Sequence, residues 1–307
     1  MPRRIRAAIP LGLLVLICAA PAWPWGPAGH HIIAIIAEQQ VSPGVREKIR
    51  TLLMDGRYSM LDISTCADQL RGASHAEGVA GEDVCQVMAG DVPATSGTWH
   101  YIQIPVPTKA ETLEAFCPHG DCVTTKIRYF SKALRASTDD AKRRQALLFL
   151  VHLIGDIHQP LHTVDRACDK GGNSERVGFL LDGQHSDLKL HQVWDTSELS
   201  LLMADYNVAD EHALAGALIA SISPVEAEKW AQATPEDMAW ESYRIAVARV
   251  YPAVPYQDFC GTEGSSAKVE TDLSIPYEED ATKVVQIQLM KAGVRLAALL
   301  ESALGER

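Results

Sequence analysis

Residues 149–162 have the sequence FLVHLIGDIHQPLH. On a helix, His152 and Asp156 lie four residues apart and therefore share one face. Pro160 cannot continue a helix, which places His162 just beyond the helix end. Two imidazoles and one carboxylate in such an arrangement can bind a divalent ion such as zinc. Taken alone, the stretch also fits a buried helix whose polar residues are satisfied by capping.

The sequence on both sides of this stretch predicts a mostly helical protein. Helical spacing of apolar residues recurs over residues 31–54, 123–136, 139–157, 209–220, 224–232, 235–250 and 277–304. Ser42-Pro43, Ser223-Pro224 and Thr234-Pro235 are typical helix starts, and the first of them divides the range 31–54 into two helices. His158 is excluded from the site because a helix turns it about 200° away from His152.

Strand signals are few. They are confined to Thr98–Pro105 and to a small hairpin at Val177–Leu190, with Asp182-Gly183 near its middle. The chain has no internal repeat, low-complexity tract or linker-like change in composition. We therefore expect one mostly helical domain over residues 25–307, with a small β-hairpin.

The N-terminus predicts a signal peptide at residues 1–24. Arg3, Arg4 and Arg6 precede an apolar run whose core, Leu11–Ile17, is too short to span a bilayer. A twin-arginine signal and a lipid attachment site at Cys18 are the alternatives. Export predicts a secreted or periplasmic protein, and no later stretch predicts a stable membrane association.

Composition constrains both the fold and the partners. The chain has 307 residues, of which 47% are hydrophobic and 22% charged, as in a globular protein. Its formal net charge of -11 counts against a basic surface for nucleic acid, so such a function requires a local site. Six cysteines follow residue 24, an even number that favours disulfides in an exported protein. The spacing predicts only the local pair of Cys117 with Cys122.

Three further segments carry groups suited to a metal site. LHQVWD at 190–195 places His191 and Asp195 four residues apart, and TCADQLR at 65–71 places Asp68 and Arg71 three apart. In WHY at 99–101 a histidine precedes a tyrosine within the predicted strand. Neighbours on a strand point to opposite faces, so the tyrosine needs a bend to reach the same pocket.

WGPAGH at residues 25–30 adds the last segment. A free amine and carbonyl at Trp25 can bind one metal ion, provided that processing leaves this residue first. With this segment, the chain resembles the type I nucleases, the nuclease S-one and nuclease P-one family. These are secreted phosphodiesterases with three zinc ions and a helical fold of the phospholipase C type. The resemblance also covers WHYIQIP at 99–105, GGN at 171–173, WESYRIA at 240–246 and QLMKAGVRLA at 288–297.

The resemblance implies three zinc sites. The first would be held by Asp68, His100, His152 and Asp156. The second would take the amine and carbonyl of Trp25 together with His30 and a bridging Asp156. The third would take His162, His191 and Asp195. Their charge would let an acidic protein hold a phosphodiester, because bound metal rather than the surface sets the local field.

The resemblance also implies the substrates and the catalytic groups. Asp68 and Arg71 would be catalytic, and Tyr101, Gln103 and Asn173 would bind substrate. A stacking tyrosine accepts any unpaired base, so single-stranded DNA and RNA are the expected partners, with mononucleotides as further substrates. The products would carry 5'-phosphates, and 3'-nucleotidase activity is a possible addition. No obligate protein partner is evident.

Some positions depart from the family pattern. Gln103 stands where Asp or Asn is usual, Cys66 stands where tryptophan is common, and the segment 240–251 lacks a family cysteine. One family disulfide is therefore expected to be absent or rerouted through Cys260. Two alternatives to the nuclease are a zinc-dependent phospholipase C, whose last ligand is typically Glu rather than Asp195, and a non-catalytic secreted metal-binding helical protein.

Overall fold

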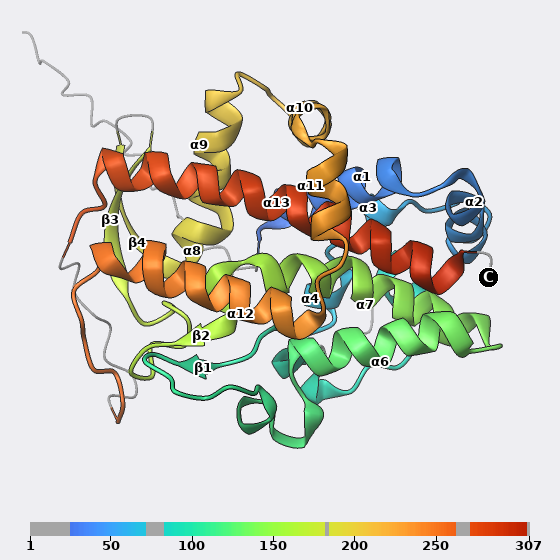
Figure 1. The fold of residues 1–307 in the computed structure, drawn as a ribbon, viewed down its shortest axis with the longest axis horizontal. Coiled ribbons are helices and arrows are strands. Elements are labelled where there is room, and N and C mark those ends of the chain that lie inside the picture. Colours follow the sequence, from blue (N-terminus) through green and yellow to red (C-terminus); the bar gives the residue numbers. More distant parts are fainter. Residues whose placement is uncertain (1–24, 72–82, 182–183, 262–270, 306–307) are drawn as a thin grey trace, which may run out of the picture.

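The computed structural model describes residues 25–71, 83–181, 184–261 and 271–305, so the expected signal peptide lies outside the described residues. This part of the chain is mostly helical, as the sequence predicts, and it contains two small two-stranded sheets (Figure 1). Among the helices described, none is both long enough and apolar enough to cross a membrane.

Helix α7 (Asp140–His158) lies at the centre of the fold, and every residue from Ala146 to His158 is buried. The carboxylate of Asp139 caps the helix by accepting hydrogen bonds from two backbone N–H groups of the first turn. The helices that pack against α7 include α1 (Pro27–Gln40), α6 (Val123–Ala136), α12 (Pro235–Ile245) and α13 (Ile275–Leu304) (Figure 1). Because α7 is enclosed, its polar side chains need partners inside the protein.

Two further helices begin at the predicted Ser-Pro starts. Ser42 accepts a hydrogen bond from Val45 N–H at the start of α2 (Pro43–Leu52), and Ser223 forms a capping box at the start of α11 (Pro224–Trp230). The remaining helices are α3 (Met60–Ile63), α4 (Cys66–Gln69), α5 (Val84–Ala89), α8 (Leu190–Gln192), α9 (Glu198–Asp205) and α10 (Glu211–Ser221). The range 235–250 is not one α-helix, since α12 gives way to a π-helical turn at Ala246–Val250.

The predicted strand at Thr98–Pro105 is mostly wrong. Residues Ala94–His100 form a 3-10 helix, which begins with a hydrogen bond of 2.9 Å from Ser96 N–H to the Pro93 carbonyl. Only β1 (Ile104–Pro105) is a strand, and it pairs in parallel with β2 (Val164–Asp165). The partner strand is parallel and distant in sequence, so no local pattern of polar and apolar residues predicts this short strand.

The hairpin is confirmed. Strand β3 (Arg176–Leu181) pairs antiparallel with β4 (Gln184–Lys189), and the predicted turn at residues 182–183 lies outside the described residues. The hairpin leads directly into α8, the helix that carries His191.

Three disulfides connect the loops, Cys66–Cys85, Cys117–Cys122 and Cys168–Cys260. The local pair is therefore confirmed. Cys66, whose state the sequence left open, joins α4 to α5, and Cys260 pairs with Cys168 in the loop that follows β2. The disulfides of Cys66 and Cys168 thus hold segments that adjoin the candidate site residues Asp68 and Asn173.

Candidate metal centre

His152 and Asp156 lie on one face of α7, as their spacing predicts, and both are fully buried. His152 Nδ1 donates to the backbone carbonyl of Ser64 over 2.7 Å. This hydrogen bond leaves Nε2 unprotonated in the neutral ring, and Nε2 lies 3.2 Å from Asp156 Oδ2. The ring is therefore oriented with Nε2 beside a carboxylate oxygen, and a hydrogen bond from the other ring nitrogen to a backbone carbonyl is typical of a metal-ligating histidine.

His100 and Asp68 bring two more ligand atoms to this pair. His100 Nδ1 lies 2.9 Å from Asp156 Oδ2 and 3.1 Å from His152 Nε2. Asp68 Oδ1 lies 3.5 Å from each of these two nitrogens. Tetrahedral zinc ligands with bonds of about 2.0–2.1 Å are roughly 3.3 Å apart, so the donor set fits one zinc ion. His152 on α7 thus contacts two residues from other segments of the chain, His100 and Asp68.

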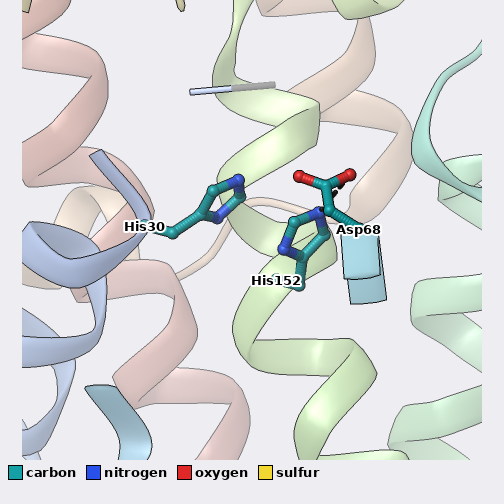
Figure 2. A group of neighbouring side chains, drawn as sticks. All are labelled: His30, Asp68 and His152. Carbon is teal, nitrogen blue, oxygen red and sulfur yellow. Dashed lines mark ion pairs between the residues drawn. The ribbon is translucent and has the colours of Figure 1, made fainter. Parts of the chain in front are cut away.

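His30 approaches the same cluster from α1. Figure 2 shows His30 and Asp68 on either side of His152, each from a different helix. The His30 ring stacks on His152 with 3.9 Å between centroids, and its Nε2 lies 3.5 Å from Asp156 Oδ1. Ligand atoms of His30, Asp68 and His152 lie within 4.8 Å of one another. Asp156 therefore faces His100 and His152 with one oxygen and His30 with the other.

Trp25, the first described residue, is fully buried. Its backbone nitrogen lies 3.3 Å from Asp195 Oδ1, and its indole Nε1 donates to the Gly155 carbonyl over 2.8 Å. The indole hydrogen bond fixes the orientation of the residue inside the fold. Trp25 consequently lies at the site rather than at the surface.

A third group contains His162, His191 and Asp195, whose ligand atoms also lie within 4.8 Å of one another. His162 Nδ1 donates to the His100 carbonyl over 2.9 Å, and His191 Nδ1 donates to the Gly171 carbonyl over 2.6 Å. His191 Nε2 lies 3.4 Å from Asp195 Oδ2. The two side chains therefore lie on one face, as their spacing of four residues predicts. The chain passes from α8 into a π-helical turn between them.

The loop before the hairpin supports this third group. Gly171 has φ +63°, and a Cβ atom at this position would lie 2.2 Å from the Leu161 carbonyl oxygen. Only glycine can therefore adopt this conformation so close to the Leu161 carbonyl. Gln159 contributes a further contact that is not among the residues predicted from the sequence, since its Nε2 donates to Asp195 Oδ1 over 2.6 Å. Its position before Pro160, at the helix end, is the sequence signal that marks it.

The electrostatics of the protein groups show why a cation fits. Burial lowers the pKa of His100 to about 4. Burial also acts to lower the pKa of His152, but the carboxylates of Asp156 and Asp68 raise it to about 10. Burial raises the pKa of Asp195 well above its usual range. Several buried ligand atoms have no hydrogen-bond partner among the described residues: both oxygens of Asp68, Asp156 Oδ1, Asp195 Oδ2 and His162 Nε2. Metal ions would satisfy these atoms.

A pocket of about 490 Å³ opens above the third group, and His162 and His191 lie in its wall. Its lining includes the four other residues predicted from the sequence, namely Arg71, Tyr101, Gln103 and Asn173. Arg71 Nη1 lies 3.6 Å from Asp68 Oδ1, which links the pocket to the first donor set. The extended backbone at Tyr101, immediately after the 3-10 helix, provides the bend that the tyrosine needs. No carboxylate is among the described lining residues, so the pocket suits an anionic ligand.

Gly155 gives a test of the position of His30. A Cβ atom on Gly155 would lie 2.7 Å from His30 Nδ1, so Gly155→Ala must displace the imidazole. We expect the variant to bind metal less tightly and to lose about 10- to 100-fold in activity. Metal content by atomic emission and kcat/KM measure the effect. Gly216→Ala on α10, where a Cβ meets nothing within 4 Å, is the matched control. Wild-type metal content and activity in Gly155→Ala would contradict the assignment of His30.

Comparison with known proteins identifies the family of the chain. The family described as S1/P1 Nuclease matches residues 25–305. Nuclease S1 of Aspergillus oryzae is 26% identical over 308 residues, which cover 98% of this chain and 98% of that protein. Nuclease P1 of Penicillium citrinum is 28% identical over 287 residues, with 89% and 95% covered. Endonuclease 2 of Arabidopsis thaliana is 28% identical over 306 residues, with 94% of each chain covered. The chain therefore belongs to the S1/P1 nuclease family, and this membership supports a nuclease or phosphodiesterase function.

Proposed function

We propose that the protein is a secreted or periplasmic zinc-dependent endonuclease. It hydrolyses single-stranded DNA and RNA to 5'-phosphorylated products and releases phosphate from 3'-mononucleotides. The observation that carries the proposal is the near-tetrahedral donor set of Asp68, His100, His152 and Asp156 next to a pocket without carboxylates. Three disulfides are in keeping with an oxidising compartment.

We assign three zinc sites within this cluster. Asp68, His100, His152 and Asp156 hold the first ion. The freed amine and the carbonyl of Trp25, with His30 and Asp156, hold the second, and His162, His191 and Asp195 hold the third. When bound, zinc lowers the pKa of water and offsets negative charge on phosphate oxygens.

The chain's own residues bind and orient the phosphodiester. Water attacks phosphorus in line with the bond to the 3'-oxygen, that bond breaks, and the leaving oxygen takes a proton. Arg71 faces the first donor set through Asp68 and offsets the charge that develops on the phosphoryl oxygens. Tyr101 stacks on an unpaired base, and Gln103 and Asn173 contact base edges from the pocket wall.

Two measurements together test the proposal. The zinc content per chain separates an enzyme with three ions from a non-catalytic scaffold with one ion or none. Parallel assays on single-stranded DNA and on phosphatidylcholine separate the nuclease from a zinc-dependent phospholipase C. Three zinc ions with cleavage of DNA alone are expected, and cleavage of phosphatidylcholine alone would overturn the nuclease assignment.

Arg71→Ala tests the role of the arginine in the reaction. Removing one preorganised cation from the developing charge should lower kcat by about 10²- to 10³-fold. The variant should keep its zinc, because the arginine approaches Asp68 from the pocket side without being a ligand. Arg249→Ala removes an arginine paired with Asp280 at the protein surface and serves as the control. Loss of zinc from Arg71→Ala would mean that this residue is structural.

A further inference from the structure

Besides Arg71, one more basic side chain of the Lys or Arg type lines the pocket, and the proposed reaction does not use it. Lys170 belongs to the pocket wall and its side chain is exposed. Arg71 is 3.6 Å from Asp68 and is thereby directed towards the first donor set. Among the described residues, no carboxylate lies within ion-pair distance of the Lys170 ammonium group. Lys170 therefore offers its charge to a ligand rather than to the protein.

The backbone of Lys170 is fixed although its side chain is exposed. Its N–H donates to Asp165 Oδ1 over 2.9 Å, and its carbonyl accepts from Asn173 Nδ2 over 3.1 Å. Its φ of 56° lies in the left-handed region, which lysine rarely adopts. The next residue, Gly171, donates to Asp169 and holds His191 through its carbonyl. The lysine thus projects from the same braced turn that orients a ligand of the third group.

We infer that Lys170 binds a phosphate of the substrate strand next to the phosphate being cleaved, and so selects polynucleotides over substrates with a single phosphate. The inference rests on the proposed function. The metal cluster and Arg71 bind the phosphate that reacts. A cation outside this cluster can pair only with a second phosphate, which is present only in a substrate longer than a single phosphodiester. The compact ammonium group suits a phosphate at variable positions and reads no base, so this contact is independent of sequence.

The test compares two thymidine substrates with identical scissile bonds. Dithymidylate has one phosphodiester, whereas pentathymidylate has three more. Lys170→Asn removes the charge and supplies a residue that tolerates the left-handed backbone. We expect its KM for pentathymidylate to rise about fivefold to tenfold with kcat nearly unchanged, because one charged hydrogen bond is lost. Cleavage of dithymidylate should not change.

Salt dependence gives a second and independent readout. One fewer phosphate contact should make the plot of log(kcat/KM) for pentathymidylate against log[salt] shallower by about 0.7. Lys170→Arg should restore both the KM and the slope. Lys283→Asn removes an exposed lysine on α13, in the wall of a different hollow, and should alter neither.

The outcomes separate the inference from the proposed function. A wild-type protein that cleaves neither substrate would overturn the proposed function and the inference with it. A wild-type protein that cleaves both, with Lys170→Asn unchanged in KM and slope, would overturn the inference alone. Equal losses on both substrates would also overturn it, because a general disturbance of the third group would act on both.

Discussion

Dialysis against a chelator is expected to abolish hydrolysis and to lower the melting temperature in parallel. The cluster buries three carboxylates, and both oxygens of Asp68 and Oδ1 of Asp156 have no hydrogen-bond partner among the described residues. An ion at a thousandfold excess over its Kd stabilises the folded state by about 4 kcal/mol. For a chain of this size, such a loss lowers Tm by on the order of 10 °C.

Calorimetry and a nuclease assay on the same samples measure this effect. Chelator that has been saturated with zinc beforehand is the control for direct effects of the chelator on the protein. Addition of zinc to the depleted protein should restore activity and Tm together, since metal binding and folding share one free energy. A depleted protein that melts at the temperature of the untreated protein would refute the metal cluster as part of the fold.

The second large effect concerns the first residue of the mature chain. We expect the active enzyme to begin at Trp25, because its nitrogen lies beside Asp195 inside the fold and only a free amine is a good ligand. Signal peptidase prefers small residues at positions -3 and -1 before the cleaved bond. Ala20 and Ala22 occupy these positions for a cut before Trp23. Removal of Trp23-Pro24 after that cut, or direct cleavage after Pro24, would expose the amine of Trp25.

Two chains released from a cleavable fusion test this directly. One begins at Trp25 and the other at Trp23, and the longer chain should contain one zinc ion fewer and lose at least about 100-fold in kcat/KM. A chain that begins at Trp25 and carries two extra residues after Arg307 controls for added length. N-terminal sequencing of the natural enzyme identifies the start. Full activity with three zinc ions in the chain beginning at Trp23 would remove Trp25 from the ligand set.

The sequence predicted those parts of the site that depend on local spacing. His152 with Asp156, and His191 with Asp195, are each four residues apart, and each pair occurs on one face in the structure. The end of α7 ahead of Pro160 was also predictable, because proline cannot continue a helix. These features depend on helical geometry alone, which operates within a few residues.

Features that depend on distant partners could not be obtained in this way. The strand expected at 98–105 became a 3-10 helix followed by two strand residues, because the pairing of Ile104 with Val164 is parallel and spans 60 positions. Six cysteines allow fifteen connectivities, so the pairing of Cys168 with Cys260 required the folded chain. The distances that bring His100 and Asp68 to α7 likewise arise from tertiary packing.

Three candidate histidine ligands are oriented by hydrogen bonds to the main chain, which affects how the site tolerates mutation. His152, His162 and His191 each donate Nδ1–H to a main-chain carbonyl, that of Ser64, His100 and Gly171 respectively. A carbonyl persists whatever side chain its residue carries, so amino-acid replacement at Ser64 leaves the donor's partner in place. Genetic drift around the cluster can therefore change many neighbouring side chains without reorienting the imidazoles. Gly171 and His100 are the exceptions, because the backbone conformation of Gly171 excludes other residue types and His100 is itself a candidate ligand.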